Sequence, residues 1–251
     1  MKKGFVLTAL YFTALSHAME GDIIQHGDSH LSLGTEHFCI RSREKAFPYS
    51  SSVNAYFAGV NFKYEYLEPK TFYAGFDGQY CLGSLVGTSS RIFPGKISYV
   101  RNKLGMVHKE LEGRLGYNVQ MGDDFLVSPY IGVGRRTVRM KNVSKSNPER
   151  IRTGCTYLAT GFRSEYSLSE TVTFGVNFKR FYAMAGEVVS NTPHLYLTPI
   201  NYGHEISFPW EVTFNGSGES FEVRLEPYFR KDNANSDELT IGTSLQISCD
   251  F

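Results

Sequence analysis

The feature that most constrains the fold is the alternation of residue types from Leu239 to Phe251. Every second position in this segment is apolar or small, and the positions between are polar or glycine. Side chains of a β-strand point to opposite faces with a period of two, so the segment predicts a strand with one apolar face. An aromatic final residue on such a strand is unusual in a soluble domain, because a bare end frays. We therefore expect the apolar face to meet lipid. That face carries Ile241, Thr243, Leu245, Ile247, Cys249 and Phe251.

The same alternation recurs along the chain. A spanning strand needs about 9–11 residues, whereas strands of globular proteins average roughly 5–6. The repeated segments have the longer length, so we predict ten strands. Eight strands is the alternative, because the first two segments alternate least clearly. The nine further segments are residues 29–40, 53–66, 71–85, 107–119, 125–139, 152–166, 172–181, 205–214 and 221–230.

Connections between these segments alternate between short and long. The short ones, at 67–70, 121–124, 167–170 and 215–218, contain the residues that tight turns use. The long ones are 41–52, 86–106, 140–151, 183–202 and 231–238. Aromatic residues such as Tyr66, Phe72, Tyr117 and Phe125 flank the short turns, as in a membrane-interface girdle. The pattern predicts an all-β, antiparallel, up-and-down transmembrane β-barrel.

The first residues have the organisation of an export signal. Lys2 and Lys3 precede an apolar stretch at 4–15, and Ser16-His17-Ala18 follows as a small-x-small cleavage site. We expect a signal peptide over 1–18, a short N-terminal segment at 19–28 on the periplasmic side, and a barrel over 29–251. No other segment approaches the roughly 18 apolar residues of a membrane helix. An exported membrane chain must then close into a barrel, because lipid offers no partners for strand edges.

The polar faces of the predicted strands carry mixed acids and bases near mid-strand. A secreted ligand-binding barrel or sandwich is the soluble alternative, but it would turn its apolar faces inward. Mixed charges favour a narrow membrane barrel in which they pair across the lumen. The alternative is a pore lining for ions or small solutes. Net charge is +1, which gives no electrostatic footprint for nucleic acid. The predicted lumen charges are Glu110, Glu112, Arg114, Arg163, Glu165, Lys179, Glu222, Arg224 and Glu226.

Together, the export signal, the amphipathic strands, the alternating connections and the final Phe251 resemble the small outer-membrane β-barrel proteins of Gram-negative bacteria, a general OmpA-like or porin-like class. The resemblance implies residence in outer-membrane lipid. It also implies that the barrel-assembly machinery recognises the last strand through Ile241, Leu245, Ile247 and Phe251. Cys249 departs from the class, in which an aromatic residue usually stands two positions before the end.

Histidines are the first candidates for catalysis. His30 and Ser32 share a face at a spacing found in some outer-membrane lipid hydrolases. Two further pairs, His108 with Glu110 and His204 with Glu205, are expected near the outer rim, where ten-strand outer-membrane proteases place Asp and His. Such a protease would need an Asp-His dipeptide, which the chain lacks, and Asp232 and Asp237 stand alone in one predicted loop. We therefore assign no catalytic, cofactor or metal-binding residue.

The cysteines divide between the two ends of the predicted barrel. Cys39, Cys81 and Cys155 fall near the outer strand ends, and their pairing stays open. Cys249 lies at the opposite end, about 33 Å away over ten residues of strand, beyond the roughly 7 Å Cα limit of a disulfide. It is either a small hydrophobe at the lipid boundary or a cross-link to another envelope protein.

For function, the leading hypothesis is a non-enzymatic surface barrel that meets host or envelope proteins through the loops at 86–106 and 183–202. The alternative is a narrow channel for ions or small solutes, and the second alternative is a hydrolase at the outer rim. The loop residues most suited to contact are Ile92, Phe93, Arg101, Lys103, Leu195 and Tyr196.

Overall fold

The computed structural model describes residues 28–46, 49–67, 70–93, 96–142, 150–190, 202–215, 220–233 and 237–250. These residues form strands and turns, and none of them lies in a helix long and apolar enough to cross a membrane. The strands are β1 (Asp28–Ala46), β2 (Tyr49–Leu67), β3 (Phe72–Phe93), β4 (Lys96–Tyr117), β5 (Val119–Gln120), β6 (Phe125–Asn142), β7 (Arg150–Ser169), β8 (Val172–Ser190), β9 (Tyr202–Ser207), β10 (Trp210–Asn215), β11 (Ser220–Asn233) and β12 (Asp237–Asp250).

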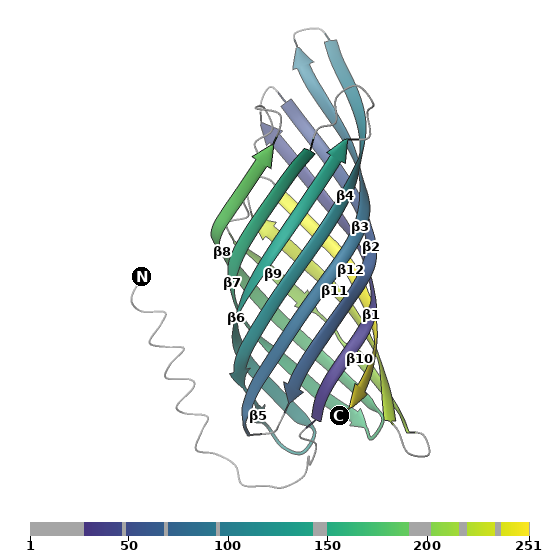
Figure 1. The fold of residues 1–251 in the computed structure, drawn as a ribbon, viewed down its shortest axis with the longest axis vertical. Helices are drawn as coiled ribbons and strands as arrows, with labels where there is room; N and C mark the ends of the chain where they lie inside the picture. The colour runs from purple at the N-terminus through teal and green to yellow at the C-terminus, as the bar shows by residue number, and fades with distance from the viewer. Residues whose placement is uncertain are drawn as a thin grey trace.

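The sheet is antiparallel and closes on itself (Figure 1). β12 pairs with β1, and both β9 and β10 bridge β8 to β11. β9 and β10 are two parts of one barrel strand, interrupted at Phe208 and at Pro209, which has no N–H to donate. β5 is a short extension beyond β4 that pairs with β6. The result is the predicted ten-strand barrel with two extra strand segments, and the single predicted strand 205–214 is corrected to β9 plus β10.

At one end of the barrel the strands run well past their predicted limits. Residues 86–106 were expected to be a loop, but β3 and β4 stay paired from Phe72 opposite Tyr117 up to Phe93 opposite Lys96. In Figure 1 this hairpin rises furthest from the barrel. Much of 41–52 and 183–190 is likewise strand. The loop prediction was wrong because a neighbouring strand offers backbone partners even where side chains do not alternate. Residues 191–201 lie outside the described residues.

The opposite end carries the short turns, as predicted. In the turn after β5, Gly122 has a φ of 78°, which is easy only for glycine, and the Met121 amide donates to the Phe125 carbonyl at 2.7 Å. The amide of Ser167 donates to the Asp124 carbonyl at 2.9 Å and ties the next hairpin to this turn. Residues 68–69 and 216–219, which belong to two of the other predicted turns, lie outside the described residues.

Aromatic rings gather beside these turns on the outside of the barrel. Tyr66 lies 5.4 Å from Phe72 between ring centroids, and Phe214 lies 5.0 Å from Phe221. Phe174 packs on Trp210 at 4.6 Å. Such rings suit a membrane–water interface because they combine apolar area with a polarisable edge.

Burial is inverted relative to a soluble protein. Leu33, Leu115 and Ile131 expose 64%, 60% and 63% of their surface, whereas Glu112 and Arg163 expose 3% each. Exposed large apolar side chains cover the outside of most described strands, and buried polar side chains outnumber buried apolar ones within the described residues. A soluble sandwich or barrel would show the reverse. The fold is therefore a transmembrane β-barrel whose outer face is made for lipid.

Three sequence predictions fall on residues that the structure does not describe. The signal peptide at 1–18 and the N-terminal segment at 19–28, apart from Asp28, are outside it. Phe251 is outside it as well. Cleavage after Ala18 and recognition of the last residue by the assembly machinery stay predictions.

Candidate functional site: the interior of the barrel

The nine predicted lumen charges all lie on the inner face of the barrel, where the period of two directs them. The two arginines Arg163 and Arg224 are buried, each exposing 3% of its surface, and Glu110 and Glu112 expose 6% and 3%. Such low exposure leaves these groups almost no contact with water. Their charges must therefore be balanced by one another.

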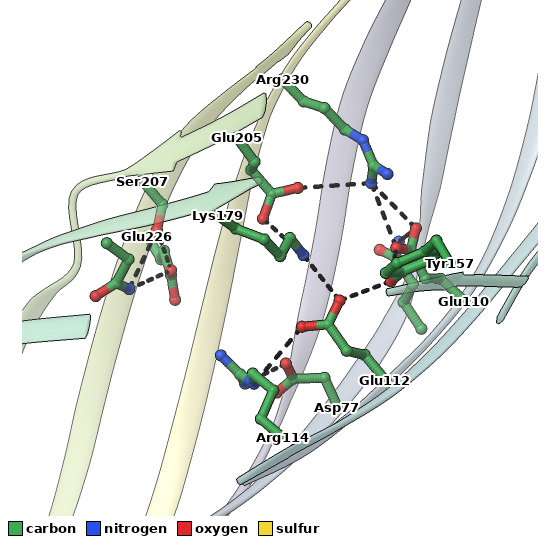
Figure 2. Close-up of polar contacts among 12 residues, drawn as sticks. Asp77, Glu110, Glu112, Arg114, Tyr157, Lys179, Glu205, Ser207, Glu226 and Arg230 are labelled. Atoms are coloured by element: carbon green, nitrogen blue, oxygen red, sulfur yellow. Dashed lines mark hydrogen bonds and ion pairs between the residues drawn. The ribbon is translucent and has the colours of Figure 1, made fainter. Parts of the chain in front are cut away.

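Glu110 is the centre of a first cluster, shown in Figure 2. Its carboxylate accepts from Arg136 at 2.8 Å and from Arg230 at 3.2 Å, and the Tyr157 hydroxyl lies 2.5 Å away. Asp232 joins the same two arginines, at 3.4 Å from Arg136 and 3.2 Å from Arg230. Strands β4, β6, β7 and β11 are tied together by this one carboxylate.

A chain of ion pairs continues from this cluster across the lumen (Figure 2). Arg230 lies 3.5 Å from Glu205, and Glu205 lies 3.0 Å from the Lys179 ammonium. Lys179 in turn donates to Glu112 at 3.2 Å, and Glu112 is 3.7 Å from Arg114. The last link is an ion pair between Arg114 and Asp77. Acids and bases alternate along the chain, so each charge before the terminal Asp77 has two opposite neighbours.

Glu65 is the centre of a second cluster. It pairs with Arg163, with Lys63 at 3.0 Å and with Arg224 at 3.5 Å, and the Tyr73 hydroxyl donates to it at 2.9 Å. Sequence reasoning missed Lys63 and Glu65. Both residues lie on β2, one of the two strands whose polar and apolar positions alternate least clearly. They share the odd-numbered positions of β2, which face inward, so the period of two would have placed both inside.

Some of the predicted lumen charges pair with one another, and Glu222 pairs with a histidine. Arg163 pairs with Glu165, and Arg224 lies 3.1 Å from Glu226. Glu222 lies instead against His30, with Nδ1 at 3.5 Å from the carboxylate, and accepts from Ser248 at 3.3 Å. Further interior charges that sequence reasoning did not select are Asp77, Arg136, Glu205, Glu211, Arg230 and Asp232.

An apolar layer lies inside the barrel beside the charges. Phe38 stacks on Phe57 with ring centroids 4.6 Å apart, and both pack with Cys81 and Met106. The side chains that contact this cluster come from β1, β6 and β11: Ile40, Val138, Met140 and Tyr228. Sequence reasoning missed the layer because it treated every inward position as polar.

Tyr157 packs directly against a glycine inside the barrel. The Tyr157 ring lies over Gly134 on the neighbouring strand, and a Cβ at Gly134 would lie 2.2 Å from that ring. Phe181 packs against Tyr157 at 5.7 Å, and the Arg230 guanidinium lies 4.2 Å from the Phe181 ring centroid. The glycine thus makes the space that lets Tyr157 reach Glu110.

None of the expected histidine pairs forms a rim site. His108 lies 3.5 Å from Glu110, but it is buried, with Phe38 and Phe57 edge-on at 5.2 and 5.9 Å, so this pair is not an exposed site. His204 stacks on Phe178 outside the barrel at 6.1 Å, whereas Glu205 points inward, because adjacent strand residues take opposite faces. Asp232, expected alone in a loop, is 1% exposed within β11.

Two of the described cysteines, Cys81 and Cys155, lie inside the barrel, and Cys39 stands on the outward face of β1. Cys39, Cys81 and Cys155 are free thiols. The backbone of Cys249 lies opposite Leu31 and Phe221, but its side chain is outside the described ones, so a cross-link stays a prediction. The described residues contain no group of three or more His, Cys, Asp or Glu side chains placed to hold a metal ion.

Carboxylates outnumber Lys and Arg in the interior ion pairs. The bases are Lys63, Arg114, Arg136, Arg163, Lys179, Arg224 and Arg230, and the acids are Glu65, Asp77, Glu110, Glu112, Glu165, Glu205, Glu211, Glu222, Glu226 and Asp232. Acidic groups are therefore in excess among the ion pairs of the described residues, which favours cations over anions.

No protein-family model and no curated protein matches this sequence. Among solved structures, the outer membrane protease OmpT from Escherichia coli is similar with a TM-score of 0.56 and 10% identity, covering 94% of this chain and 100% of that one. The translocator domain of the autotransporter NalP from Neisseria meningitidis has a TM-score of 0.49 and 9% identity, covering 98% and 95%. Ail, the attachment invasion locus protein of Yersinia pestis, has a TM-score of 0.36 and 11% identity, covering 90% and 100%.

At such low sequence identities, the likeness supports a conclusion about the fold alone. The likeness to OmpT spans nearly the whole chain and supports the β-barrel fold. The other two scores, below 0.5, support no conclusion about this chain. The protein thus resembles the outer-membrane β-barrel proteins of Gram-negative bacteria.

Proposed function

We propose that the chain is an outer-membrane barrel with a closed lumen, which acts through its surface and not by conduction. The observation that carries the proposal is the packing of the interior. Glu65, Glu112, Arg163 and Arg224 each expose only 3% of their surface, and their ion pairs cross from one wall to the other. Ten strands also lie near the narrow end of barrel sizes, since wide aqueous channels need about 16.

The surface that we assign to partner contact is the β3–β4 hairpin. Its two strands are paired along their whole length, so binding a partner there costs little conformational entropy for ordering the backbone. Residues 85–109 include Arg91, Lys96, Arg101, Lys103 and Lys109 and contain no Asp or Glu. A basic, partly apolar hairpin is suited to an acidic host or envelope protein.

Single-channel conductance in a planar bilayer tests the closed lumen. We expect the refolded chain to insert, as judged by a heat-modifiable band on a gel, and to give no steady unit conductance. Steady current steps from the inserted wild-type chain would contradict the proposal. They would favour the narrow channel instead, and the excess of interior carboxylates predicts that such steps would be cation-selective.

A second experiment tests the surface assignment. Replacing residues 88–101 by Asn-Gly should leave a heat-modifiable barrel, because Gly87 pairs with Asn102 and an Asn-Gly pair between them closes a tight hairpin. If the shortened chain folds but still captures the same acidic envelope or host proteins as the wild type, the hairpin is not the contact surface.

Assembly by the barrel-assembly machinery is part of the proposal. Ile241, Leu245 and Ile247 face outward on β12 with exposures of 48%, 48% and 57%. β12 is the strand that closes the barrel onto β1. Deleting Phe251 should lower the folded yield in cells more than it lowers folding of the purified chain into detergent, and equal effects would count against recognition of the last residue.

A further inference from the structure

One buried carboxylate of the lumen has only neutral partners. Glu36, on β1, exposes 5% of its surface. Its carboxylate accepts from the Asn61 amide nitrogen at 2.7 Å, and the Tyr228 hydroxyl is hydrogen-bonded to it. No lysine, arginine or histidine of the described residues forms an ion pair with Glu36. Neutral donors do not balance a negative charge, and an unbalanced buried charge is costly. The Glu36 carboxylate therefore needs a counter-charge from outside the described side chains.

The strand register gathers oxygen atoms around this carboxylate. In one row Gly34 stands between Gln246 on β12 and Asn61 on β2, and in the next inward row Glu36 stands opposite Ser244. Adjacent strands lie about 4.8 Å apart, and paired residues share a face. The Asn61 amide nitrogen links the two rows, because it donates to Glu36 and to Ser244 at 2.7 Å each. We name Glu36, Asn61, Ser244 and Gln246 the seam cluster, since β12 closes the barrel onto β1 here.

Two amide carbonyl oxygens of the seam cluster have no hydrogen-bond donor among the described residues. They are Oδ1 of Asn61 and Oε1 of Gln246, and these residues expose only 7% and 5% of their surface. The Gln246 side chain lies over Gly34, where a Cβ would be 2.8 Å from its Cγ, so the absent side chain of Gly34 leaves space between the two amides. Buried carbonyl oxygens normally accept a hydrogen bond. Two such oxygens beside an unbalanced carboxylate suit a positively charged group that takes oxygen ligands.

The bases nearest in the strand register are held by other carboxylates. Lys63, on β2, lies 3.0 Å from Glu65 and 3.8 Å from Glu226. Arg224, on β11, lies 3.1 Å from Glu226 and 3.5 Å from Glu65. Because acids outnumber bases in the interior ion pairs of the described residues, moving either base to Glu36 would leave another acid without its partner. The counter-charge for Glu36 is therefore not a rearranged lysine or arginine.

We propose that the seam cluster binds a monovalent alkali cation, Na⁺ or K⁺. Its donors are the Glu36 carboxylate, the two amide oxygens and the Ser244 hydroxyl, which are the oxygen ligands that hard cations prefer. One carboxylate balances one positive charge, whereas Ca²⁺ takes about six to eight oxygens and commonly more than one carboxylate. A proton on Glu36 would remove the charge, but its single O–H could donate to only one of the two carbonyl oxygens. A monovalent cation accounts for the charge and for both oxygens.

The test uses the full refolded chain in micelles of an uncharged detergent at neutral pH. Sodium or potassium chloride replaces N-methylglucamine chloride at constant ionic strength, so that general screening stays the same, and the thermal unfolding midpoint is followed. The variants are Glu36→Gln, which removes the charge, and Gln246→Met, which keeps the length of the side chain and removes the amide oxygen. The matched control is Glu165→Gln, since Glu165 is a lumen carboxylate that pairs with Arg163 and lies outside the seam cluster.

We expect Na⁺ or K⁺ to raise the wild-type midpoint, because a ligand that binds only the folded state stabilises it. Glu165→Gln should keep this response even if its midpoint starts lower. Glu36→Gln should lose the response, and Gln246→Met should need about tenfold more cation, as expected for the loss of one contact to a charged group. A wild-type midpoint that is equal in all three chlorides would overturn the proposal, as would an unchanged response in Glu36→Gln.

Further measurements separate the other ways to neutralise Glu36. A wild-type midpoint that ignores the cation but rises when the pH is lowered would assign a protonated carboxyl group and overturn the proposal. A response to Ca²⁺ at lower concentrations than to Na⁺ would overturn the choice of a monovalent ion. If Glu36→Gln does not fold, Gln246→Met and Glu165→Gln are compared, and an equal cation dependence of these two variants would contradict the site.

Discussion

Glu110 shows how much a single inward residue does in this barrel. It meets Arg136, Arg230, Tyr157, His108 and Gln79, which come from five different positions around the wall. A carboxylate with two oxygens satisfies these donors only because the strands converge on it. Removing one charge from such a group leaves its partners uncompensated in a confined space.

Glu110→Gln keeps the shape of the side chain and removes its charge. Breaking a buried ion pair costs about 3–5 kcal/mol, and the remaining contacts of both arginines with Asp232 should hold the loss near the lower end. We expect a lower urea midpoint in a refolded sample. The control is Glu187→Gln, since Glu187 and Arg135 are 53% and 58% exposed in their side chains and lie 3.9 Å apart. Surface pairs contribute about 0–1 kcal/mol, so an equal loss in both variants would contradict the assignment of Glu110.

Gly134→Ala tests the crowding over the same cluster. The new Cβ would lie 2.2 Å from the Tyr157 ring, so the ring must move away from Glu110 and Glu112. We expect a loss of about 1–3 kcal/mol, the usual effect of overpacking, seen as a lower urea midpoint. Gly154→Ala is the control because its nearest neighbours would be 3.9 Å away, an ordinary contact. A neutral Gly134→Ala would mean that Tyr157 is free to move.

At the scale of the strand, one period of two separates lipid from lumen. Along β11 the side chains of Phe221, Leu225 and Phe229 are 45–46% exposed, while Glu222 and Arg224 between them are buried. A slip of one residue would exchange these two sets. The sharp contrast between the faces therefore fixes the register of each strand pair.

Leu225→Arg places a charge on the lipid face at mid-strand. Arg at the bilayer midplane costs about 2–4 kcal/mol, and the cost falls near the interfaces. We expect less heat-modifiable barrel on a gel. Met184→Arg is the matched control. Met184, on β8, is 66% exposed and faces outward like Leu225. It lies beyond Arg180, where the outer face already carries a cation. Equal losses in the two variants would mean that the lipid boundary is placed wrongly.

At the scale of the molecule, the interior is filled by two kinds of layer. The ion-pair clusters around Glu110 and Glu65 occupy one part, and the apolar cluster of Phe38, Phe57, Cys81 and Met106 occupies another. Strands β2, β3 and β4 contribute to both. Either layer alone would obstruct a narrow lumen, since one excludes water by packing and the other holds fixed charges in the path.

This redundancy predicts how the barrel could be opened. Phe38→Ala with Phe57→Ala should remove much of the apolar layer and destabilise the barrel without giving steady current, because the ion pairs remain. Adding Glu65→Ala and Arg163→Ala should produce conductance in a planar bilayer. Current from the phenylalanine variant alone would show that the charges do not close the lumen, and a silent quadruple variant that is still heat-modifiable would show that other side chains close it.

Local chemistry in the sequence determined the strand number, the short turns and the face of most side chains. Consecutive residues of a strand point to opposite faces, so Leu115 and Arg114 could be assigned to opposite faces without knowing which strands lie beside them. The tertiary structure decided which charges meet, because Glu65 and Arg163 come together only through the stagger of strands around a closed barrel. It also decided where the strands end, since the β3–β4 hairpin is held by pairing and not by alternation. The tertiary structure likewise decided the apolar layer, because its residues are distant in sequence and meet only through register.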